Sequence, residues 1–339
     1  MAPLPGGVAE QQETAPHSLT MARVSVLMPV YKPKVEYFAQ ALDCLFAQTE
    51  QDWECIIHNQ PWEFDLKGAL SKYLVDPRVK FYQGDVVRTI GGNWNACLPY
   101  ATSPYLAYLF YDDLWEPDYL KTLCDVLDAN PSVGFVSANR SYLFMGDSPK
   151  EAIYDEATEF MKTMKPGLHE GIPELAAWMD RGLKPNAIGE PSFVIMRRSV
   201  VDEAGPFHPT MAQFLDAEYW TRCLAVSDWY YEPRTLGKFR VHVSGTSALN
   251  AAAGKGLYDR LETMELAVGL LPARMRPRAK AALRHTLADM IRKYADRWKK
   301  ARTGIKTPGG GGAAAVKKFA FKHPVIMAGA IIEALLRKR

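Results

Sequence analysis

Two adjacent acids, Asp112 and Asp113, follow an uninterrupted apolar and aromatic run at residues 105–110. Such a run, without glycine or proline, is typical of a strand buried on both faces of a parallel sheet. Ligands of open α/β sheets bind beyond the carboxyl ends of the strands, and neighbouring carboxylates repel each other unless a cation or a proton lies between them. One interpretation of the pair is therefore a site for Mg²⁺ or Mn²⁺, held by carboxylate and substrate phosphate oxygens.

A helix N-terminus is the other interpretation of the same pair. Acidic side chains are stabilised there by the helix dipole, and Pro117 would fit the first helical turn. The spacing of the two acids does not decide between a metal site and a helix start.

Strands and helices are expected to alternate on the amino-terminal side of this pair. Apolar runs bounded by turn residues predict the strands, and apolar residues at helical spacing predict the helices between them. The expected strands are 23–31, 53–58, 79–82 and 105–110, and the expected helices are 35–48 and 66–74. This order predicts an α/β fold with a doubly wound, mostly parallel sheet and flanking helices.

Five short motifs occur along this part of the chain. They are Pro-Val-Tyr at 29–31, Gln-Thr-Glu-Gln-Asp-Trp-Glu at 48–54, Asn-Trp-Asn-Ala at 93–96, Ala-Thr-Ser-Pro-Tyr at 101–105 and Tyr-Asp-Asp at 111–113. In this order they resemble the inverting, family-2-type nucleotide-sugar glycosyltransferases, and the resemblance extends from about Val24 to Ser247. It implies a GT-A fold, a nucleoside-diphosphate sugar donor, and substrate contacts from Pro29, Tyr31, Asn93 and Asn95.

The resemblance assigns the acid pair to the family's metal-binding Asp-x-Asp element. It implies that Asp112 is a metal ligand supported by Asp113, with Phe110 at the place of the leading acid. Where the family often holds a uracil base with acids, this chain has Asn59, whose amide can donate and accept hydrogen bonds at a base edge. Asp85, after the third expected strand, is a further candidate for the base or the ribose.

A second acidic element is expected in the carboxyl-terminal half. The segment Asn-Ala-Ile-Gly-Glu-Pro-Ser at 186–192 resembles the acceptor-side loop of some family members, which implies that Glu190 lies near the site. The alternative is a structural role for Glu190, either capping a helix or pairing with Arg197 or Arg198.

A helix is expected at 214–224, since Leu215, Tyr219 and Cys223 repeat every four residues. Asp216 falls in its first turn, at the positive end of the helix dipole. The resemblance implies that Asp216 is the catalytic base and that Glu218 is a second acid of the site. The alternative is that Asp216 is only a helix-start acid.

The segment Arg-Val-His at 240–242 precedes a stretch rich in serine and glycine and resembles the family's closing signature. It implies that His242 approaches the metal or the diphosphate and that Arg240 contacts phosphate. The alternative for a lone histidine is an ordinary place in the core.

Together these residues imply inverting transfer of a sugar to a saccharide or lipid-linked acceptor, in bacterial-type polysaccharide or glycolipid assembly. Asp216 would accept the proton of the acceptor hydroxyl, and a single displacement would invert the anomeric carbon. A cation at Asp112 would stabilise the leaving diphosphate. Two alternatives are a non-catalytic nucleotide-sugar-binding protein with a degenerate metal site, and a nucleotidyltransferase of similar sheet topology.

Composition is typical of a globular protein of a reducing compartment. Of the 339 residues, 48% are hydrophobic and 23% are charged, and the five dispersed cysteines, expected as buried thiols, include no CxxC pair. Residues 1–20 lack the basic and apolar regions of a signal peptide, so a cytoplasmic protein is expected.

Positive charge is concentrated near the carboxyl end. Residues 299–339 contain ten Lys or Arg and one acid, Glu333, so this segment carries +9 and the remaining residues carry −6 of the total of +3. The asymmetry favours an anionic surface as the partner of the tail and argues against nucleic acid as the partner of the whole protein.

The apolar stretch 324–332 within this tail is too short to span a bilayer. The tail is expected either to lie on an anionic membrane surface, peripherally at the cytoplasmic face, or to dock on its own body or a second copy. The expected organisation is a disordered leader (1–21), a GT-A domain (22–250) with a nucleotide half (22–140) and an acceptor half (141–250), a helical extension (251–303), a Gly-rich linker (304–315) and a basic amphipathic tail (316–339).

Overall fold

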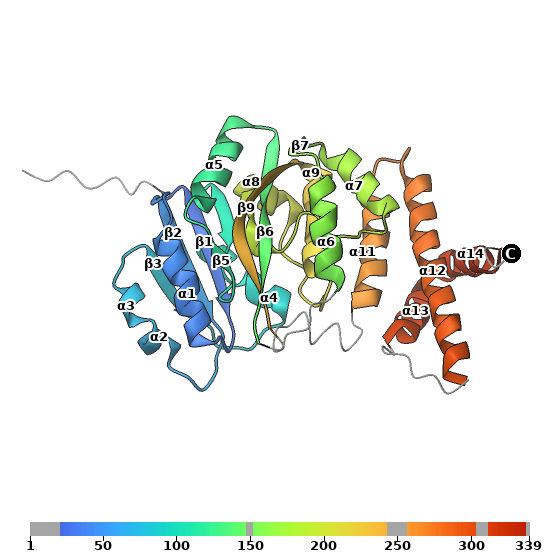
Figure 1. Ribbon diagram of the computed structural model, residues 1–339, viewed down its shortest axis with the longest axis horizontal. Coiled ribbons are helices and arrows are strands. Elements are labelled where there is room, and N and C mark those ends of the chain that lie inside the picture. Colours follow the sequence, from blue (N-terminus) through green and yellow to red (C-terminus); the bar gives the residue numbers. More distant parts are fainter. Residues whose placement is uncertain (1–20, 147–151, 243–255, 303–310, 337–339) are drawn as a thin grey trace, which may run out of the picture.

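The computed structural model describes residues 21–146, 152–242, 256–302 and 311–336. At its centre lies a mixed sheet of nine strands (Figure 1), ordered β3-β2-β1-β4-β8-β6-β9-β5, with β7 paired to β9. This α/β architecture with flanking helices confirms the fold class expected from the sequence. The expected leader, apart from its last residue, lies outside the described residues.

The first four strands form a parallel half of the sheet. β1 runs beside both β2 and β4, and β2 runs beside β3. Every residue of β1, β2 and β4 is buried, as expected of strands covered on both faces. The strands are β1 (Val24–Val30), β2 (Trp53–Asn59), β3 (Val79–Gln83) and β4 (Tyr105–Tyr108).

The other half is built around two long strands that the sequence did not reveal. β6 (Val133–Phe144) and β9 (Asp228–Val241) run parallel to each other, and β8 (Val194–Arg197) joins β6 to β4 by antiparallel pairing. β5 (Leu114–Trp115) and β7 (Gly167–His169) both pair antiparallel with β9. Polar residues interrupt both long strands, so apolar runs alone did not indicate them.

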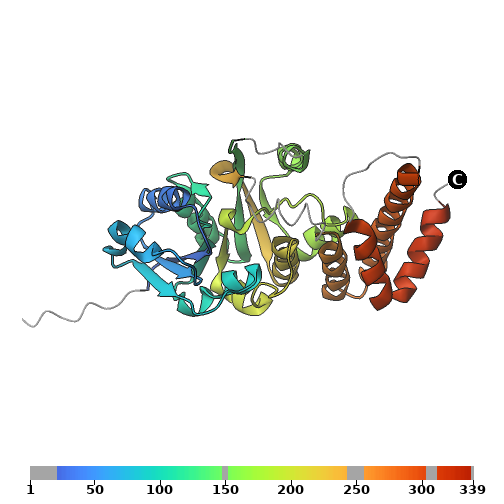
Figure 2. The ribbon, with the colours of Figure 1, turned by 90° about the horizontal axis from the view of Figure 1, so that it is seen from below.

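Helices cover both faces of the sheet (Figure 2). Alternate side chains of β1 belong to two separate cores, one packed by α1 (Val35–Phe46) and α5 (Tyr119–Ala129), the other by α7 (Gly171–Asp180) and α9 (Leu215–Val226). The remaining helices around the sheet are α2 (Leu66–Ala69), α3 (Ser71–Leu74), α4 (Ile90–Asn95), α6 (Ala152–Thr163) and α8 (Arg198–Ala204), with short 3₁₀ turns at Leu98–Tyr100 and Pro191–Phe193.

Four helices in the described residues follow the sheet and form the end of the molecule farthest from β3 (Figures 1 and 2). They are α11 (Gly256–Leu270), α12 (Arg276–Arg302), α13 (Gly311–Lys322) and α14 (Pro324–Leu336). α13 packs on α11 and α12, and α14 packs on α12, so one face of the expected tail docks on the chain's own body. No helix in the described part of the chain combines the length and apolar character needed to cross a bilayer.

α13 begins at Gly311, inside the range 304–315 that was expected to be a linker. The physical reason is the run of alanines at 313–315, which favours helix, together with the burial of Val316 and Phe319. The glycines at 309–310 lie outside the described residues.

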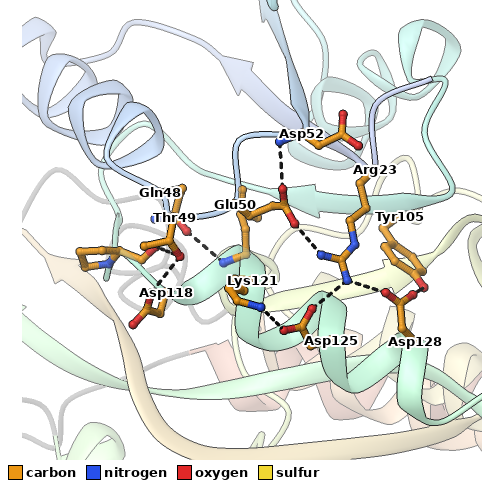
Figure 3. Close-up of polar contacts among 12 residues, drawn as sticks. Arg23, Gln48, Thr49, Glu50, Asp52, Tyr105, Asp118, Lys121, Asp125 and Asp128 are labelled. Atoms are coloured by element: carbon orange, nitrogen blue, oxygen red, sulfur yellow. Dashed lines mark hydrogen bonds and ion pairs between the residues drawn. The ribbon is translucent and has the colours of Figure 1, made fainter. Parts of the chain in front are cut away.

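The Gln-Thr motif holds the segment that follows β5 (Figure 3). The buried Gln48 side chain donates to the Glu116 carbonyl and accepts from the Leu120 amide, both at 2.9 Å. The Thr49 amide donates to the Pro117 carbonyl at 2.8 Å. These bonds fix the path of the chain between β5 and α5, and therefore the position of the turn that precedes β5.

Arg23 makes a second attachment at the same place (Figure 3). Its guanidinium group donates to Glu50 at 2.5 Å, and to Asp125 and Asp128 of α5 at 2.9 and 2.5 Å. The arginine thus ties the start of β1 to the loop before β2 and to α5.

Gln48→Ala is expected to lower the free energy of unfolding by about 1–3 kcal/mol, because it leaves the buried Leu120 amide without a partner, whereas the Glu116 carbonyl keeps the Tyr119 amide as a donor. Urea denaturation monitored by circular dichroism measures this change. Thr158→Ala is the control: the exposed Thr158 hydroxyl bonds only within α6, and its loss should change stability by no more than about 0.5 kcal/mol. Equal stability of the two variants would contradict the role given to Gln48.

Candidate active site

Asp112 and Asp113 lie in the turn between β4 and β5. β4 ends at Tyr108, two residues earlier than expected, and the Phe110 amide donates to the Ser192 hydroxyl at 3.1 Å instead of continuing the strand. α5 begins only at Tyr119, well after the two acids. The helix N-terminus interpretation of the pair is therefore wrong.

Strand β9 holds this turn in place through Arg240. The Arg240 amide donates to Asp113 Oδ1 at 3.1 Å, and Arg240 Nε donates to the Asp112 carbonyl at 2.8 Å. The guanidinium group also donates to Gln40 of α1 at 2.7 Å and lies over the ring of Tyr37. Arg240, which was expected at a phosphate, is thus buried between the turn and α1.

His242 lies beside Asp112. Its Nε2 is 3.0 Å from Asp112 Oδ2, and its ring packs edge-on against Tyr37. The histidine is buried, yet it faces a carboxylate and not an apolar core. The structure therefore brings together the two side chains that the sequence assigned to the metal.

Asp113 is a buried carboxyl group with an unsatisfied oxygen. Its Oδ2 has no hydrogen-bond partner within the described residues, and burial, together with the charge of Asp112, raises the pKa of Asp113 well above its usual range. Among those residues, no three His, Cys, Asp or Glu side chains form a complete metal site. Asp112 and His242 are the two adjacent side chains that could bind a cation here, and a cation held by them would need further ligands from substrate phosphates and water.

Asp216 lies in the first turn of α9, as expected. Asn186 Nδ2 donates to Asp216 Oδ2, and the Ala217 amide donates to Asp216 Oδ1, both at 2.8 Å. Burial, followed by the charge of the nearby Glu190, raises the pKa of Asp216 to about 6. A carboxylate with this proton affinity is suited to accept a proton near neutral pH.

Glu190 is paired with Arg140, and not with either arginine considered from the sequence. Arg140 Nε lies 2.7 Å from Glu190 Oε2, and the arginine side chain is only 3% exposed. Gly189 makes room for it: this glycine has φ of +102°, and a Cβ atom there would lie 2.8 Å from Arg140 Nη1. The backbone of the 186–192 loop can take its position only with glycine at this point.

Glu190 also links the two groups of acids. Its charge raises the pKa of both Asp113 and Asp216, so it lies near both carboxyl groups. The 186–192 loop joins the two elements directly, because the Ser192 hydroxyl accepts from the Phe110 amide and Asn186 donates to Asp216.

Two of the expected residues are engaged elsewhere. Glu218 forms a double ion pair with Arg222, with Nε–Oε1 and Nη2–Oε2 distances of 2.8 Å. Asn95 donates to the Phe207 carbonyl and accepts from the Phe207 amide, at 2.8 and 2.9 Å. The structure does not bring either side chain to Asp216.

The candidates for the nucleotide lie near the carboxyl ends of β1 and β2. Pro29 is buried in β1, and Tyr31 follows that strand and is partly exposed. Asn59 and Asn93 each have a buried amide oxygen without a hydrogen-bond partner in the described part of the chain, so both can accept from a ligand. Asp85 is exposed on the loop after β3, 3.7 Å from Arg88.

Reasoning from the sequence missed Arg140 and Asn186. Arg140 lies in the polar middle of β6, and only the fold places it against Glu190. Asn186 belongs to a segment that was singled out, and its spacing from Gly189 could have indicated a loop closed by its own side chain, because that side chain binds both the amide and the carbonyl of Gly189.

The family assignment rests on the match of residues 25–204 to the family model described as Glycosyl transferase family 2. The chain belongs to this family. It is therefore a glycosyltransferase of the nucleotide-sugar type, as the motifs in its sequence implied.

Two relatives illustrate the range of the sequence similarity. The uncharacterized protein MT1568 of Mycobacterium tuberculosis (strain CDC 1551 / Oshkosh) is 25% identical over 239 residues, which cover 70% of this chain and 73% of that protein. The UDP-Glc:alpha-D-GlcNAc-diphosphoundecaprenol beta-1,3-glucosyltransferase WfgD of Escherichia coli is 21% identical over 160 residues, covering 47% of this chain and 61% of that protein.

Solved structures of two similar proteins support the GT-A-like fold. TarS 1–349 of S. aureus in complex with UDP-GlcNAc has a TM-score of 0.59 at 14% identity, covering 84% of this chain and 76% of that one. Mannosyltransferase PcManGT from Pyrobaculum calidifontis, in complex with GDP-Man and Mn²⁺, has a TM-score of 0.58 at 16% identity, covering 96% and 91%.

The stability of this glycosyltransferase is expected to depend on pH through Asp216. Because the pKa of this carboxyl is raised on folding, to about 6, the folded state binds its proton more tightly than the unfolded chain does. The contribution of Asp216 to stability should therefore fall as pH rises from about 4 to about 6. Asp216→Asn removes this component, so urea denaturation at a series of pH values should give a smaller decrease for the variant.

Asp202→Asn replaces an exposed acid of α8 and serves as the control. It should retain the wild-type dependence on pH. The same dependence in wild type and Asp216→Asn would contradict the raised proton affinity of Asp216.

Proposed function

We propose that the chain is a metal-dependent inverting glycosyltransferase in which Asp216 is the general base. The observation that supports this most directly is the half-buried Asp216 carboxyl, oriented by Asn186, with its pKa raised to about 6. Such a base can take the proton of an acceptor hydroxyl as its oxygen attacks the anomeric carbon. Direct attack of this kind inverts the anomeric configuration.

The neighbours of Asp216 act on its pKa in opposite directions. Donation from Asn186 and from the Ala217 amide stabilises the carboxylate form, which keeps the group able to accept a proton. The charge of Glu190 acts in the opposite direction and increases its proton affinity. Arg140 pairs with Glu190 and limits the cost of placing two acids close together.

We further propose that Asp112, Asp113 and His242 hold Mg²⁺ or Mn²⁺ together with the donor diphosphate. When bound, such a cation stabilises the negative charge that develops on the leaving nucleoside diphosphate. The protein's own contribution is orientation, because Arg240 fixes both acids of the turn from β9.

The donor in this proposal is a nucleoside-diphosphate hexose. The solved complexes of TarS with UDP-GlcNAc and of PcManGT with GDP-Man and Mn²⁺ support a sugar nucleotide and differ in the base. The acceptor is the hydroxyl of a saccharide or a lipid-linked saccharide, in bacterial-type polysaccharide or glycolipid assembly at the cytoplasmic face of the membrane. The name of the glucosyltransferase relative, which specifies a diphosphoundecaprenol acceptor, supports this class.

Asp216→Asn is expected to lower kcat/KM for transfer by about 10²–10⁴-fold, the usual contribution of a general base, without weakening donor binding. Release of nucleoside diphosphate from UDP-glucose, UDP-GlcNAc or GDP-mannose measures turnover, and isothermal titration with the same donor measures affinity. The wild-type kcat/KM should rise with pH through about 6, as Asp216 loses its proton.

Asp202→Asn controls for the loss of a carboxylate from the surface and should keep wild-type turnover. Parallel loss of turnover and donor affinity in Asp216→Asn would place this residue in donor binding and overturn its assignment as the base.

A further inference from the structure

The outer face of α14 carries an apolar stripe, here called the α14 stripe: Val325, Ile331, Ile332, Leu335 and Leu336. Phe321, near the end of α13, is a sixth exposed apolar side chain in this part of the chain. Phe321 is 91% exposed and Val325 is 83% exposed. These six are among the sixteen large apolar side chains that are exposed in the described residues, and all six lie within 321–336. Scattered exposed apolar residues are ordinary, but a contiguous group of this kind marks an interaction surface.

The inner face of α14 accounts for its docking on the chain. Ala330 and Ala334 are buried, and Arg284 of α12 pairs with Glu333 at 3.0 Å. His285 of α12 lies at the same distance from the other oxygen of Glu333. Because Glu333 is the single ionisable residue of α14 and is bound on the inner side, the outer side of this helix is apolar along its whole length.

Basic residues accompany the stripe in α13 and follow α14 in the sequence. Lys317, Lys318 and Lys322 are exposed in α13, and the sequence continues beyond α14 as Arg337-Lys338-Arg339. Lys322 pairs with Glu262, yet its side chain remains 52% exposed. Long basic side chains at the ends of an apolar helix face can reach phosphate headgroups while the face itself enters the region of the acyl chains.

We propose that the α14 stripe binds the surface of an anionic lipid bilayer. Charge decides between this partner and a second copy of the chain. Two copies meeting through their stripes would bring two sets of basic residues together, because Glu333 is the one acid within residues 311–336 and the nearby acids Glu262 and Asp180 are, like it, already paired with basic side chains. Anionic headgroups neutralise these residues instead, while the acyl region covers the apolar side chains.

In this proposal, α14 lies in the plane of the membrane–water interface. Its 13 residues are too few to span a bilayer. α14 lies at the end of the molecule farthest from β3 (Figures 1 and 2) and packs on α12, which in turn packs on α11. α11 also contacts α9, the helix that carries Asp216, so the bilayer would approach the molecule from the side of the acceptor half.

Flotation of the full-length protein with lipid vesicles tests this proposal. The vesicles are phosphatidylcholine alone and phosphatidylcholine mixed with phosphatidylglycerol. The chain offers a matched pair of variants, because Val75, in the turn after α3, is 81% exposed and Val325 is 83% exposed. Wild type and Val75→Asp should float with the phosphatidylglycerol vesicles at low salt, and recovery should fall at high salt.

Val325→Asp should lower the partition coefficient between vesicles and water at least about tenfold. The substitution removes a valine side chain that the acyl region would cover and brings a charge to the acyl boundary. Thermal unfolding should be the same for both variants, because neither valine is buried. Equal recovery of Val325→Asp and wild type would overturn the proposal, and so would wild-type recovery that is the same with and without phosphatidylglycerol.

Light scattering distinguishes the second-copy alternative. If wild type is a dimer that Val325→Asp converts to a monomer while flotation is unchanged, the stripe is an interface between copies and the membrane proposal is wrong. None of these readouts uses a sugar nucleotide, so they stand apart from the test of the proposed transferase mechanism.

Discussion

The attachment of Arg240 to the Asp112–Asp113 turn is the interaction on which the rest of the site depends. Two neighbouring carboxylates repel each other. Here the buried Asp113 carboxyl accepts a hydrogen bond from the Arg240 amide, and the Asp112 carboxylate lies beside His242. Both contacts come from the end of β9, a strand that reaches the turn from the far half of the sheet. The proposed metal-binding side of the enzyme therefore depends on the whole sheet and not on a local motif.

The proposed base, Asp216, illustrates how a functional group can lower the stability of the folded state. Asp216 is held among partners that raise its proton affinity, and Glu190 contributes to this through its charge. Ionising such a group at neutral pH opposes folding, which an exposed acid would not do. Arg140 reduces this cost, because its buried guanidinium group neutralises Glu190 while Gly189 lets the loop approach.

Local patterns predicted the parallel half of the sheet well, because β1, β2 and β4 are short and mostly apolar segments. The four-residue repeat around Leu215 likewise predicted the first turn of α9 and the place of Asp216. β6 and β9 could not be recognised in this way, since both contain polar residues and each strand pairs with a partner far along the chain. The pairing of Arg140 with Glu190 is of this kind and appears only in the fold. The pairing of Glu218 with Arg222, by contrast, lies at helical i, i+4 spacing and could have been expected.

Thermal shift measurements with nucleoside diphosphates, with and without Mn²⁺, test most directly whether these residues form a donor site. A ligand that binds the native state raises the unfolding temperature by mass action. Stabilisation by the diphosphate of one base, dependent on Mn²⁺, abolished in Asp112→Ala and retained in Asp216→Asn, is the result expected of a metal-held diphosphate beside a separate base. No stabilisation by any nucleotide, or the same Mn²⁺-dependent stabilisation in Asp112→Ala, would contradict it.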